Sequence, residues 1–213
     1  MTTSRTTKDL LYEQVARIAK AAASPKRLEL IELLSQAPKT VDVLAQQVDI
    51  SIKLASAHLK ELKSARLVES ERQGKYVVYR LASEDVARFL VTIRRLAEDR
   101  LYELQEALNQ LSTSTTEWIG TSRDELLEKA KKGDVVVIDV RPADEYEAAH
   151  LPYARSMPLA ELKTRIAELP KNKPVIAYCR GPFCLMSADA VKLLRSKGIK
   201  ASQLRDGVAE WLG

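Results

Sequence analysis

The chain has 213 residues, of which 46% are hydrophobic and 30% charged, and its formal net charge is +5. This length and composition predict a soluble globular protein of one or two domains. No apolar stretch approaches the ~20 residues of a membrane span, and the first residues lack the apolar core of a signal peptide, so a cytoplasmic protein with no membrane partner is expected.

The first 81 residues predict four helices followed by a β-hairpin. Apolar residues recur at helical spacing in each helical segment, and Ser24-Pro25 supplies an N-cap and a first-turn proline. A run rich in charged residues precedes Gln73-Gly74, and a run rich in valine and tyrosine follows it. Two such runs around a glycine-containing turn are typical of a hairpin. The expected helices cover residues 10–23, 25–37 and 40–48 and a segment capped by Ser51, and the expected strands cover residues 67–72 and 75–81.

The fourth helix and the hairpin carry an excess of positive charge. Residues 51–80 hold seven basic and three acidic side chains, an imbalance that favours phosphate binding. Four helices followed by a basic hairpin predict a winged helix-turn-helix, in which the fourth helix enters the major groove and the hairpin contacts the backbone of the DNA. The inward face of the fourth helix is expected to be formed by Leu54, Ala55, His58 or Leu59, and Leu62. The residues expected to face DNA are Lys53, Ser56, Ala57, His58, Lys60, Arg72 and Lys75.

Three stretches within residues 51–81 resemble the ArsR-type family of bacterial winged-helix repressors. They read Ala-Ser-Ala-His-Leu-Lys-Glu-Leu from Ala55, Ala-Arg-Leu-Val from Ala65 and Gly-Lys-Tyr-Val-Val-Tyr-Arg-Leu from Gly74, and the resemblance extends over about residues 8–111. It implies a homodimer on a double-stranded DNA operator. Many members respond to metals, but this chain has no cysteine in its third helix and no histidine in residues 83–111, so no metal site is expected.

A long helix is predicted over residues 83–111, which contain neither glycine nor proline. Its apolar stripe, from Val86 to Leu111, is too long to bury on a small winged domain, so we expect it to pair with a second chain. The alternative is an intrachain spacer packed on the second domain. The first domain is expected to cover residues 1–111, and the polar run Ser112–Thr116 to begin a linker over residues 112–120.

Residues 121–213 predict an α/β domain with a mainly parallel sheet, because buried strand patterns at 135–140 and 175–178 alternate with helical patterns. The two cysteines of the chain, Cys179 and Cys184, follow the second strand, at the sheet edge where such folds bind ligands. They are too few for a disulfide framework. A strand-to-helix turn there offers free N–H groups and a helix dipole, which favour a thiolate. The expected helices cover residues 121–132, 144–149, 159–169 and 184–197.

Several short pieces around these cysteines resemble the rhodanese domain over about residues 117–213. They are Ile138-Asp-Val-Arg-Pro142, Glu145-Tyr146, His150-Leu-Pro152 with Ala154-Arg155, Ala188, and Asp206-Gly207 with Trp211. The resemblance implies that Cys179 accepts sulfur from a small donor as a persulfide and passes it to a thiol or another nucleophile. It also implies that Arg180 and the N–H groups of the loop stabilise the anion. Asp139, Arg141, Glu145 and His150 are expected to shape the site, and no cofactor is expected.

Four positions depart from the usual rhodanese pattern. Pro182 and Cys184 stand where the loop commonly has glycine and arginine, and Ala149 and Tyr153 also replace glycine. The lost arginine weakens the case for thiosulfate turnover, whereas the second thiol favours a redox role. Cys184 is a resolving thiol, a second sulfur carrier or a small buried residue in the first turn of a helix. The six-residue length from Cys179 to Cys184 is typical of sulfur rather than phosphate or arsenate chemistry.

The leading hypothesis is a dimeric DNA-binding repressor whose rhodanese-like domain senses reactive sulfur species through Cys179, with Cys184 as a second thiol. One alternative is a thiosulfate or persulfide sulfurtransferase that carries a DNA-binding domain. Another is a repressor that responds to arsenic or another oxyanion at the same loop.

Overall fold

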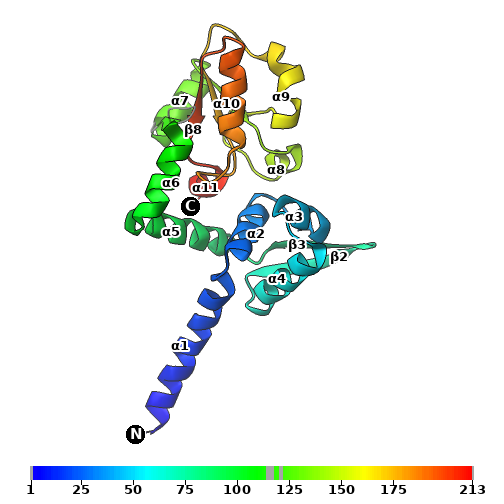
Figure 1. Cartoon of the computed structure of the whole chain (residues 1–213), viewed down its shortest axis with the longest axis vertical. Coiled ribbons are helices and arrows are strands. Elements are labelled where there is room, and N and C mark those ends of the chain that lie inside the picture. Colours follow the sequence, from blue (N-terminus) through cyan, green and yellow to red (C-terminus); the bar gives the residue numbers. More distant parts are fainter. Residues whose placement is uncertain (1, 114–117, 120–121, 213) are drawn as a thin grey trace. The chain divides into compact units, whose positions relative to one another are not determined.

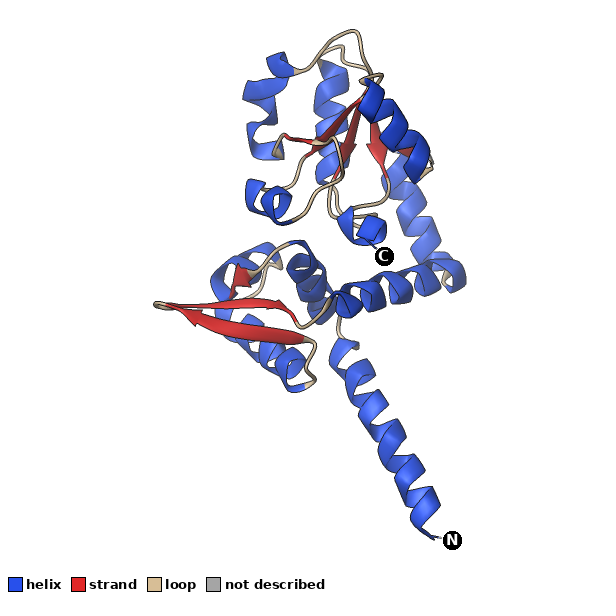
Figure 2. Cartoon of the chain, turned by 180° about the vertical axis from the view of Figure 1, so that it is seen from behind, coloured by secondary structure: helices blue, strands red, loops and turns tan. Residues whose placement is uncertain are grey.

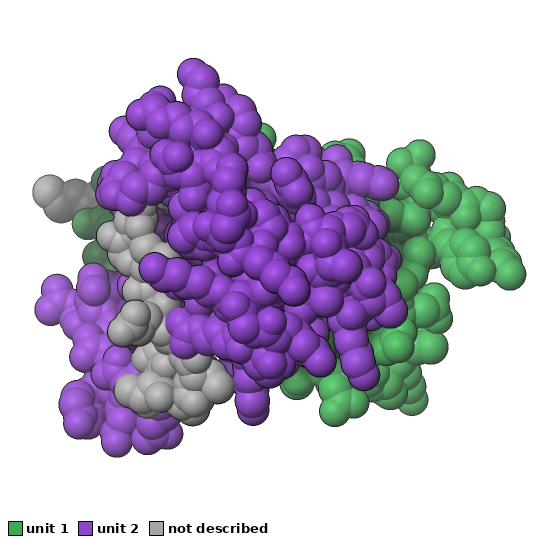
Figure 3. All heavy atoms as spheres, turned by 90° about the horizontal axis from the view of Figure 1, so that it is seen from above, with its two compact units in different colours: residues 1–90 green, residues 91–213 purple. Residues whose placement is uncertain are grey.

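A computed structural model describes residues 2–113, 118–119 and 122–212. The chain divides into two compact units, Met1–Leu90 and Val91–Gly213, which Figure 3 distinguishes by colour. The expected linker over residues 112–120 falls largely on positions 114–117 and 120, which lie outside the described residues.

The first unit contains four helices and a three-stranded antiparallel sheet, drawn in Figures 1 and 2. The sheet order is β1-β3-β2, because a short strand before α3 pairs with the second strand of the hairpin. The elements are α1 (Thr2–Ala22), α2 (Pro25–Gln36), β1 (Lys39–Thr40), α3 (Val41–Gln47), α4 (Ile52–Ser64), β2 (Val68–Gln73) and β3 (Tyr76–Leu81).

This arrangement confirms the predicted winged helix-turn-helix, and its local signals act as expected. Pro25 is the first residue of α2. The Thr40 hydroxyl accepts a hydrogen bond from the Val43 backbone N–H at 3.4 Å, and the Ser51 hydroxyl accepts one from the Leu54 N–H at 3.2 Å. These side chains replace partners that the first turns of α3 and α4 lack.

Three details of the sequence interpretation are wrong in this unit. Helix α1 begins at Thr2 rather than near residue 10, because its first two turns are polar and carry no apolar periodicity. Leu54 was expected to face inward but is 44% exposed; of the two alternatives for the core position, His58 and Leu59, the buried one is Leu59. Strand β1, with only two residues, was not predicted.

Helix α5 (Glu84–Arg100) contributes residues to both units. Its first turns bury Val86 and Leu90 in the core of the first unit. The prediction of a single helix over residues 83–111 is wrong, because the helix is interrupted at Leu101 and the chain continues as a second helix, α6 (Tyr102–Thr113). The Gln105 side chain donates a hydrogen bond to the Glu98 carbonyl oxygen at 2.7 Å and so satisfies a backbone group at the end of α5.

The second unit confirms the predicted α/β domain with a five-stranded sheet of order β4-β8-β7-β5-β6, in which all pairs are parallel. Side chains alternate across it: Ile138 and Ala177 pack with α9 and α10, whereas Val137 and Ile176 pack with α7 and α11. The elements are β4 (Trp118–Ile119), α7 (Arg123–Lys132), β5 (Val136–Asp139), α8 (Ala143–Ala148), β6 (Arg155–Ser156), α9 (Leu159–Arg165), β7 (Val175–Tyr178), α10 (Met186–Ser196), β8 (Ala201–Leu204) and α11 (Val208–Leu212).

One boundary in this unit matters for the site. Helix α10 begins at Met186, two residues after the expected start, so Cys184 lies in a loop and not in a first helical turn. The cysteine loop therefore runs from Cys179 to Leu185, and the six residues from Cys179 to Cys184 all lie within it. Three strands were not predicted, because β4 and β6 have two residues each and β8 contains polar side chains.

Ala149 and Tyr153, two of the three residues that replace a common rhodanese glycine, differ in backbone conformation. Ala149 has φ −165°, an extended value that any residue adopts. Tyr153 has φ +65°, in the left-handed region, which costs a non-glycine residue about 1–2 kcal/mol. The fold tolerates both substitutions without a change in its order of strands.

The cysteine loop as candidate functional site

Cys179 directly follows β7, at the carboxyl end of the central strand of the sheet, and is only 2% exposed. The loop turns back after it, because the Cys184 N–H donates to the Gly181 carbonyl oxygen at 3.1 Å. Gly181 has φ +147°, a value that favours glycine. A Cβ at Gly207 would lie 2.7 Å from the Cys179 carbonyl oxygen, so only glycine fits beside the base of the loop.

A buried serine and glutamine orient a proton toward the Cys179 sulfur. The Ser187 hydroxyl, in the first turn of α10, lies 3.0 Å from the Cys179 Sγ. The Gln203 side chain on β8 donates to the same hydroxyl oxygen at 2.8 Å. Because a hydroxyl has one proton to donate, accepting from Gln203 leaves the Ser187 proton available to the sulfur.

These contacts lower the pKa of the Cys179 thiol. Burial is the strongest single influence and opposes ionisation, but it is outweighed by hydrogen bonds from the Cys184 thiol, the Ser187 hydroxyl and the backbone around Ser187 and Gly181. Their sum lowers the pKa of Cys179 from an ordinary value near 9 to about 7. Donating to Cys179, together with burial, raises the pKa of Cys184 well above its usual range. Cys179 is therefore the more acidic thiol of the pair and Cys184 the less acidic one.

Asp139 and Arg141 form a fully buried ion pair at the end of the neighbouring strand β5. Asp139 accepts hydrogen bonds from the Arg141 backbone N–H and Nε at 3.0 Å, and the Arg141 guanidinium also donates to the Ala149 carbonyl oxygen at 2.7 Å. Their hydrogen bonds connect the end of β5 to the segment after α8. This geometry fits the expected role in shaping the site.

Arg180 makes a two-pronged contact with the carboxylate of Glu145 on α8. Its Nε donates to Oε2 at 2.9 Å, and a terminal nitrogen donates to Oε1 at 2.6 Å. Glu145 is fully buried and the Arg180 side chain is 14% exposed. This ion pair links the cysteine loop to α8. The sequence interpretation instead predicts that the Arg180 guanidinium stabilises the sulfur anion.

His150 is exposed, and its contacts are with Tyr146. The two rings stack at 4.0 Å between centroids, and His150 Nδ1 lies 2.9 Å from the Tyr146 carbonyl oxygen. The next residue, Leu151, donates its N–H to the Tyr178 hydroxyl at 3.1 Å. These bonds hold the segment between α8 and β6 beside the strand that ends at Cys179.

The residues expected to face DNA lie on α4 and the hairpin of the first unit. Lys53, Ser56, Ala57 and Lys60 are exposed, and His58 is half-buried. Arg72 and Lys75 are exposed near the tip of the hairpin, where the Arg72 Nε donates to the Gly74 carbonyl oxygen at 3.1 Å.

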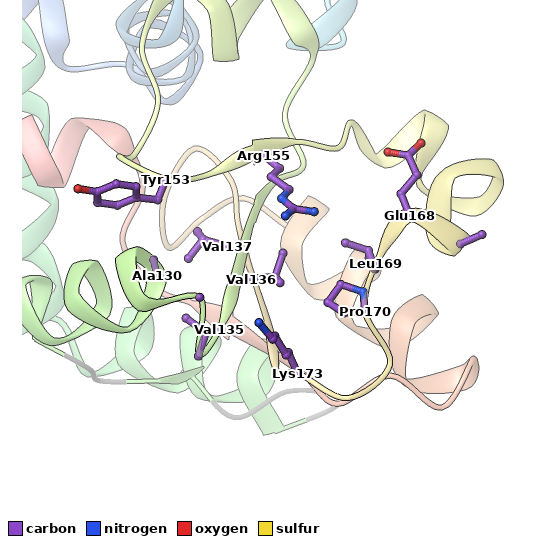
Figure 4. Close-up of a pocket in the computed structure, with 12 residues that line it drawn as sticks. Ala130, Val135, Val136, Val137, Tyr153, Arg155, Glu168, Leu169, Pro170 and Lys173 are labelled. Carbon is purple, nitrogen blue, oxygen red and sulfur yellow. The ribbon is translucent and has the colours of Figure 1, made fainter.

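A hollow of about 440 Å³ lies elsewhere in the second unit (Figure 4). Its lining comes from the end of α7, the start of β5 and the loop before β7, and includes Arg155 and Lys173. These are the amino ends of the strands, whereas Cys179 follows a carboxyl end. None of the predicted site residues lines this hollow.

In the part of the chain that the structure describes, no group of three or more histidine, cysteine or acidic residues could hold a metal ion. Among the same residues, no helix combines the length and the apolar character needed to cross a membrane.

Family comparisons agree with both units. Residues 24–70 match the model of bacterial regulatory proteins of the arsR family, and residues 122–213 match the rhodanese-like domain. The chain is 40% identical over 204 residues to the HTH-type transcriptional regulator Rv0324 of Mycobacterium tuberculosis, a match that covers 96% of this chain and 89% of the relative. The chain therefore belongs to the arsR family of DNA-binding transcriptional regulators and carries a C-terminal rhodanese-like domain.

Other relatives match parts of the chain. The HTH-type transcriptional repressor SmtB of Mycobacterium tuberculosis is 29% identical over 92 residues, which cover 43% of this chain and 68% of the repressor. A tRNA sulfurtransferase of Desulfurococcus amylolyticus is 30% identical over 137 residues, 64% of this chain and 27% of that protein. Among solved structures, the homodimeric winged helix-turn-helix domain of Mb0332 from Mycobacterium bovis is 40% identical, covers 45% of this chain and 89% of that domain, and has a TM-score of 0.43.

Four buried residues at or near the cysteine loop were missed from the sequence: Ser187, Gln203, Arg94 and Glu210. The sequence contains a feature that could have indicated three of these four residues. Ser187 is a hydroxyl residue just after the cysteines, Gln203 is a polar residue among apolar ones, and Arg94 lies four residues after Leu90 on the apolar stripe of α5.

The thiol of Cys184 is predicted to set the pKa of Cys179. Replacing Cys184 by alanine removes the largest influence that lowers this pKa, so the pKa moves from about 7 toward 9. The pH dependence of Cys179 alkylation, followed by peptide mass, measures it. Cys184→Ser keeps a hydroxyl donor and serves as the matched control with a smaller shift. An unchanged midpoint in Cys184→Ala would contradict the assignment.

Arg141→Met is predicted to destabilise the second unit by about 3–5 kcal/mol, because it leaves the buried Asp139 charge without its partner. Both tryptophans of the chain, Trp118 and Trp211, belong to this unit, so urea unfolding followed by their fluorescence reports its stability. The variant Asp139→Asn/Arg141→Met removes both charges and should lose less than Arg141→Met alone. An equal or larger loss would show that the ion pair is not the cause.

Proposed function

We propose that this regulator is a dimeric repressor that senses reactive sulfur species at Cys179. The observation that carries the proposal is a buried cysteine in a rhodanese-like loop of a DNA-binding chain, with the Ser187 hydroxyl 3.0 Å from its sulfur. The lowered pKa raises the ionised fraction of this cysteine, and the thiolate is the nucleophilic form of cysteine. Addition of a sulfur atom to Cys179 then weakens the binding of the dimer to its operator.

The loading step is a sulfur transfer from a persulfide or polysulfide. The Cys179 thiolate attacks the outer sulfur of the donor, a new S–S bond forms at Sγ, and the S–S bond of the donor breaks. The donor leaves as a thiolate that takes the electron pair. The hydrogen-bond donors that stabilise the resting thiolate also suit the anionic persulfide.

Cys184 supplies a second step. Its sulfur attacks the Cys179 Sγ, the proton of the thiol transfers to the outer sulfur, and hydrosulfide leaves while a disulfide joins the two cysteines. No external oxidant is needed, because the persulfide already carries the oxidation. The distance of 3.3 Å between Cys179 Sγ and the Cys184 carbonyl oxygen supports this role, since it brings the two cysteines close together.

Dimerisation is supported by apolar side chains that a single chain leaves exposed. They occur on α1 and around the break between α5 and α6, and comprise Leu10, Leu11, Tyr12, Val15, Leu96, Leu101 and Tyr102. Exposed apolar side chains that recur on one helix favour association with another chain. A dimer presents two copies of α4 to the two half-sites of an operator. In this proposal the protein acts in the cytoplasm, where its operator DNA lies.

The second thiol of the cysteine loop bears on the choice between a sensor and a sulfurtransferase. Cys184 stands where rhodanese loops commonly have arginine, and this exchange of a cation for a second thiol favours a redox sensor over a turnover enzyme. Cyanide-dependent sulfur transfer at an enzymatic rate, unchanged in a variant that no longer binds DNA, would support a sulfurtransferase instead. Release of DNA by arsenite but not by polysulfide would support an oxyanion sensor.

The central test is a mobility shift on the DNA upstream of the gene for this protein, with intact mass measured on the same samples. Polysulfide is expected to add sulfur to the wild type and to weaken its DNA binding at least tenfold. Cys179→Ser should bind DNA like the wild type and lose the response. Cys184→Ser should accept sulfur but form no internal disulfide. A normal response of Cys179→Ser would overturn the proposal.

Lys53 and Lys60 are predicted to bind DNA phosphates through α4. Replacing both by alanine should weaken binding and lower the slope of log affinity against log salt by about two, roughly one for each lost phosphate contact. Lys131→Ala, an exposed lysine on α7 of the second unit, is the control and should leave the slope unchanged. An unchanged slope in the Lys53→Ala/Lys60→Ala variant would place the DNA contact elsewhere.

A further inference from the structure

The cysteine loop packs against a helix that lies outside the matched rhodanese-like domain. Arg94 of α5 is 6% exposed and forms an ion pair with Glu210 of α11. A buried ion pair is weak support for stability, because apolar residues of similar size often serve as well or better. An arginine on the apolar stripe of α5 therefore points to a specific role for the pair.

The Arg94–Glu210 pair lies directly against one side of the loop. A Cβ added at Gly181 would be 3.4 Å from both terminal nitrogens of Arg94 and 3.3 Å from Glu210 Oε2. The guanidinium carbon of Arg94 also lies 5.3 Å from the centroid of the Phe183 ring, within range of a cation–π contact. Two residues between Cys179 and Cys184 are thus in contact with α5.

The same ion pair connects to the other side of the loop. Glu210 Oε2 accepts a hydrogen bond from the Gly207 N–H at 2.9 Å, and Gly207 fits closely against the Cys179 carbonyl oxygen. A second ion pair joins α5 to this region, between Glu98 and Arg205. The backbone of the loop is therefore confined between Gly207 and the Arg94–Glu210 pair.

We propose that Arg94 is a positioning residue of the cysteine loop and transmits the state of Cys179 to helix α5. The inference rests on the proposed loading of Cys179. A sulfur atom added at a buried Sγ needs space, and a closely packed loop responds by shifting between discrete arrangements. Such a shift displaces Gly181 and Phe183, which contact Arg94. Helix α5 also holds Val86 and Leu90 in the core of the DNA-binding unit, so a change at Arg94 acts on that unit.

The test uses the full chain with Arg94→Gln and Glu210→Gln combined, which removes both charges and leaves neither buried alone. Arg94→Lys keeps the charge but loses the planar contact with Phe183. Arg95→Gln, an exposed arginine at the next position of α5, is the matched control. Three quantities are measured with and without polysulfide: the sulfur on Cys179 by intact mass, the DNA affinity, and the hydrogen exchange of α5.

The Arg94→Gln/Glu210→Gln variant is expected to load Cys179, yet its DNA affinity should change less than about twofold where the wild type and Arg95→Gln change at least tenfold. Hydrogen exchange of residues 84–100 should respond to loading in the wild type and not in this variant, and Arg94→Lys should recover part of the response. If the variant loads and releases DNA like the wild type, the inference is wrong and the sensor proposal stands. If the loaded wild type keeps its DNA affinity, the sensor proposal fails, and the exchange of α5 still decides whether Arg94 carries the signal.

Discussion

The hydrogen bonds around the Cys179 sulfur are the interactions on which the proposed chemistry of the second unit depends. A thiol that is 2% exposed would ordinarily resist ionisation, because burial penalises the charged form. Donors from Cys184, Ser187 and the loop backbone reverse this preference. Each donor has a fixed position: Ser187 is held by Gln203 of the adjacent strand, and the backbone of the loop is turned by Gly181.

Buried ion pairs hold the surroundings of the loop in place. Asp139–Arg141 and Glu145–Arg180 join the ends of the strands to α8, and Arg94–Glu210 joins α11 to α5. Charges of this kind are costly to bury and confer little net stability when compared with apolar residues. Their concentration around one cysteine fits a site whose geometry, rather than its stability, is under constraint.

Much of this architecture could be predicted from the sequence, because it depends on local signals. Proline and serine mark the starts of helices, valine-rich runs mark the buried strands, and the cysteine loop follows the strand as predicted. The partners of the loop could not be predicted in the same way. Gln203 and Glu210 come together with Cys179 only through the order of the strands and the packing of α11.

The break at Leu101 shows a second limit of sequence patterns. Residues 83–111 contain no glycine or proline, so nothing local ends the helix, and the Gln105 contact with the Glu98 carbonyl depends on the turn itself. Likewise, the start of α10 at Met186 depends on how the chain packs after the loop. The later start of α10 places Cys184 in the loop rather than in a helix, with its carbonyl oxygen 3.3 Å from Cys179 Sγ.

The claim that sulfur on Cys179 controls DNA binding is tested most directly by native mass spectrometry of half-loaded protein mixed with limiting operator DNA. Free and DNA-bound dimers are separated by mass, and the added sulfur is counted in each. The account predicts that DNA-bound dimers are depleted in loaded Cys179 and that free dimers are enriched in it. The same distribution of sulfur in both populations would contradict the account.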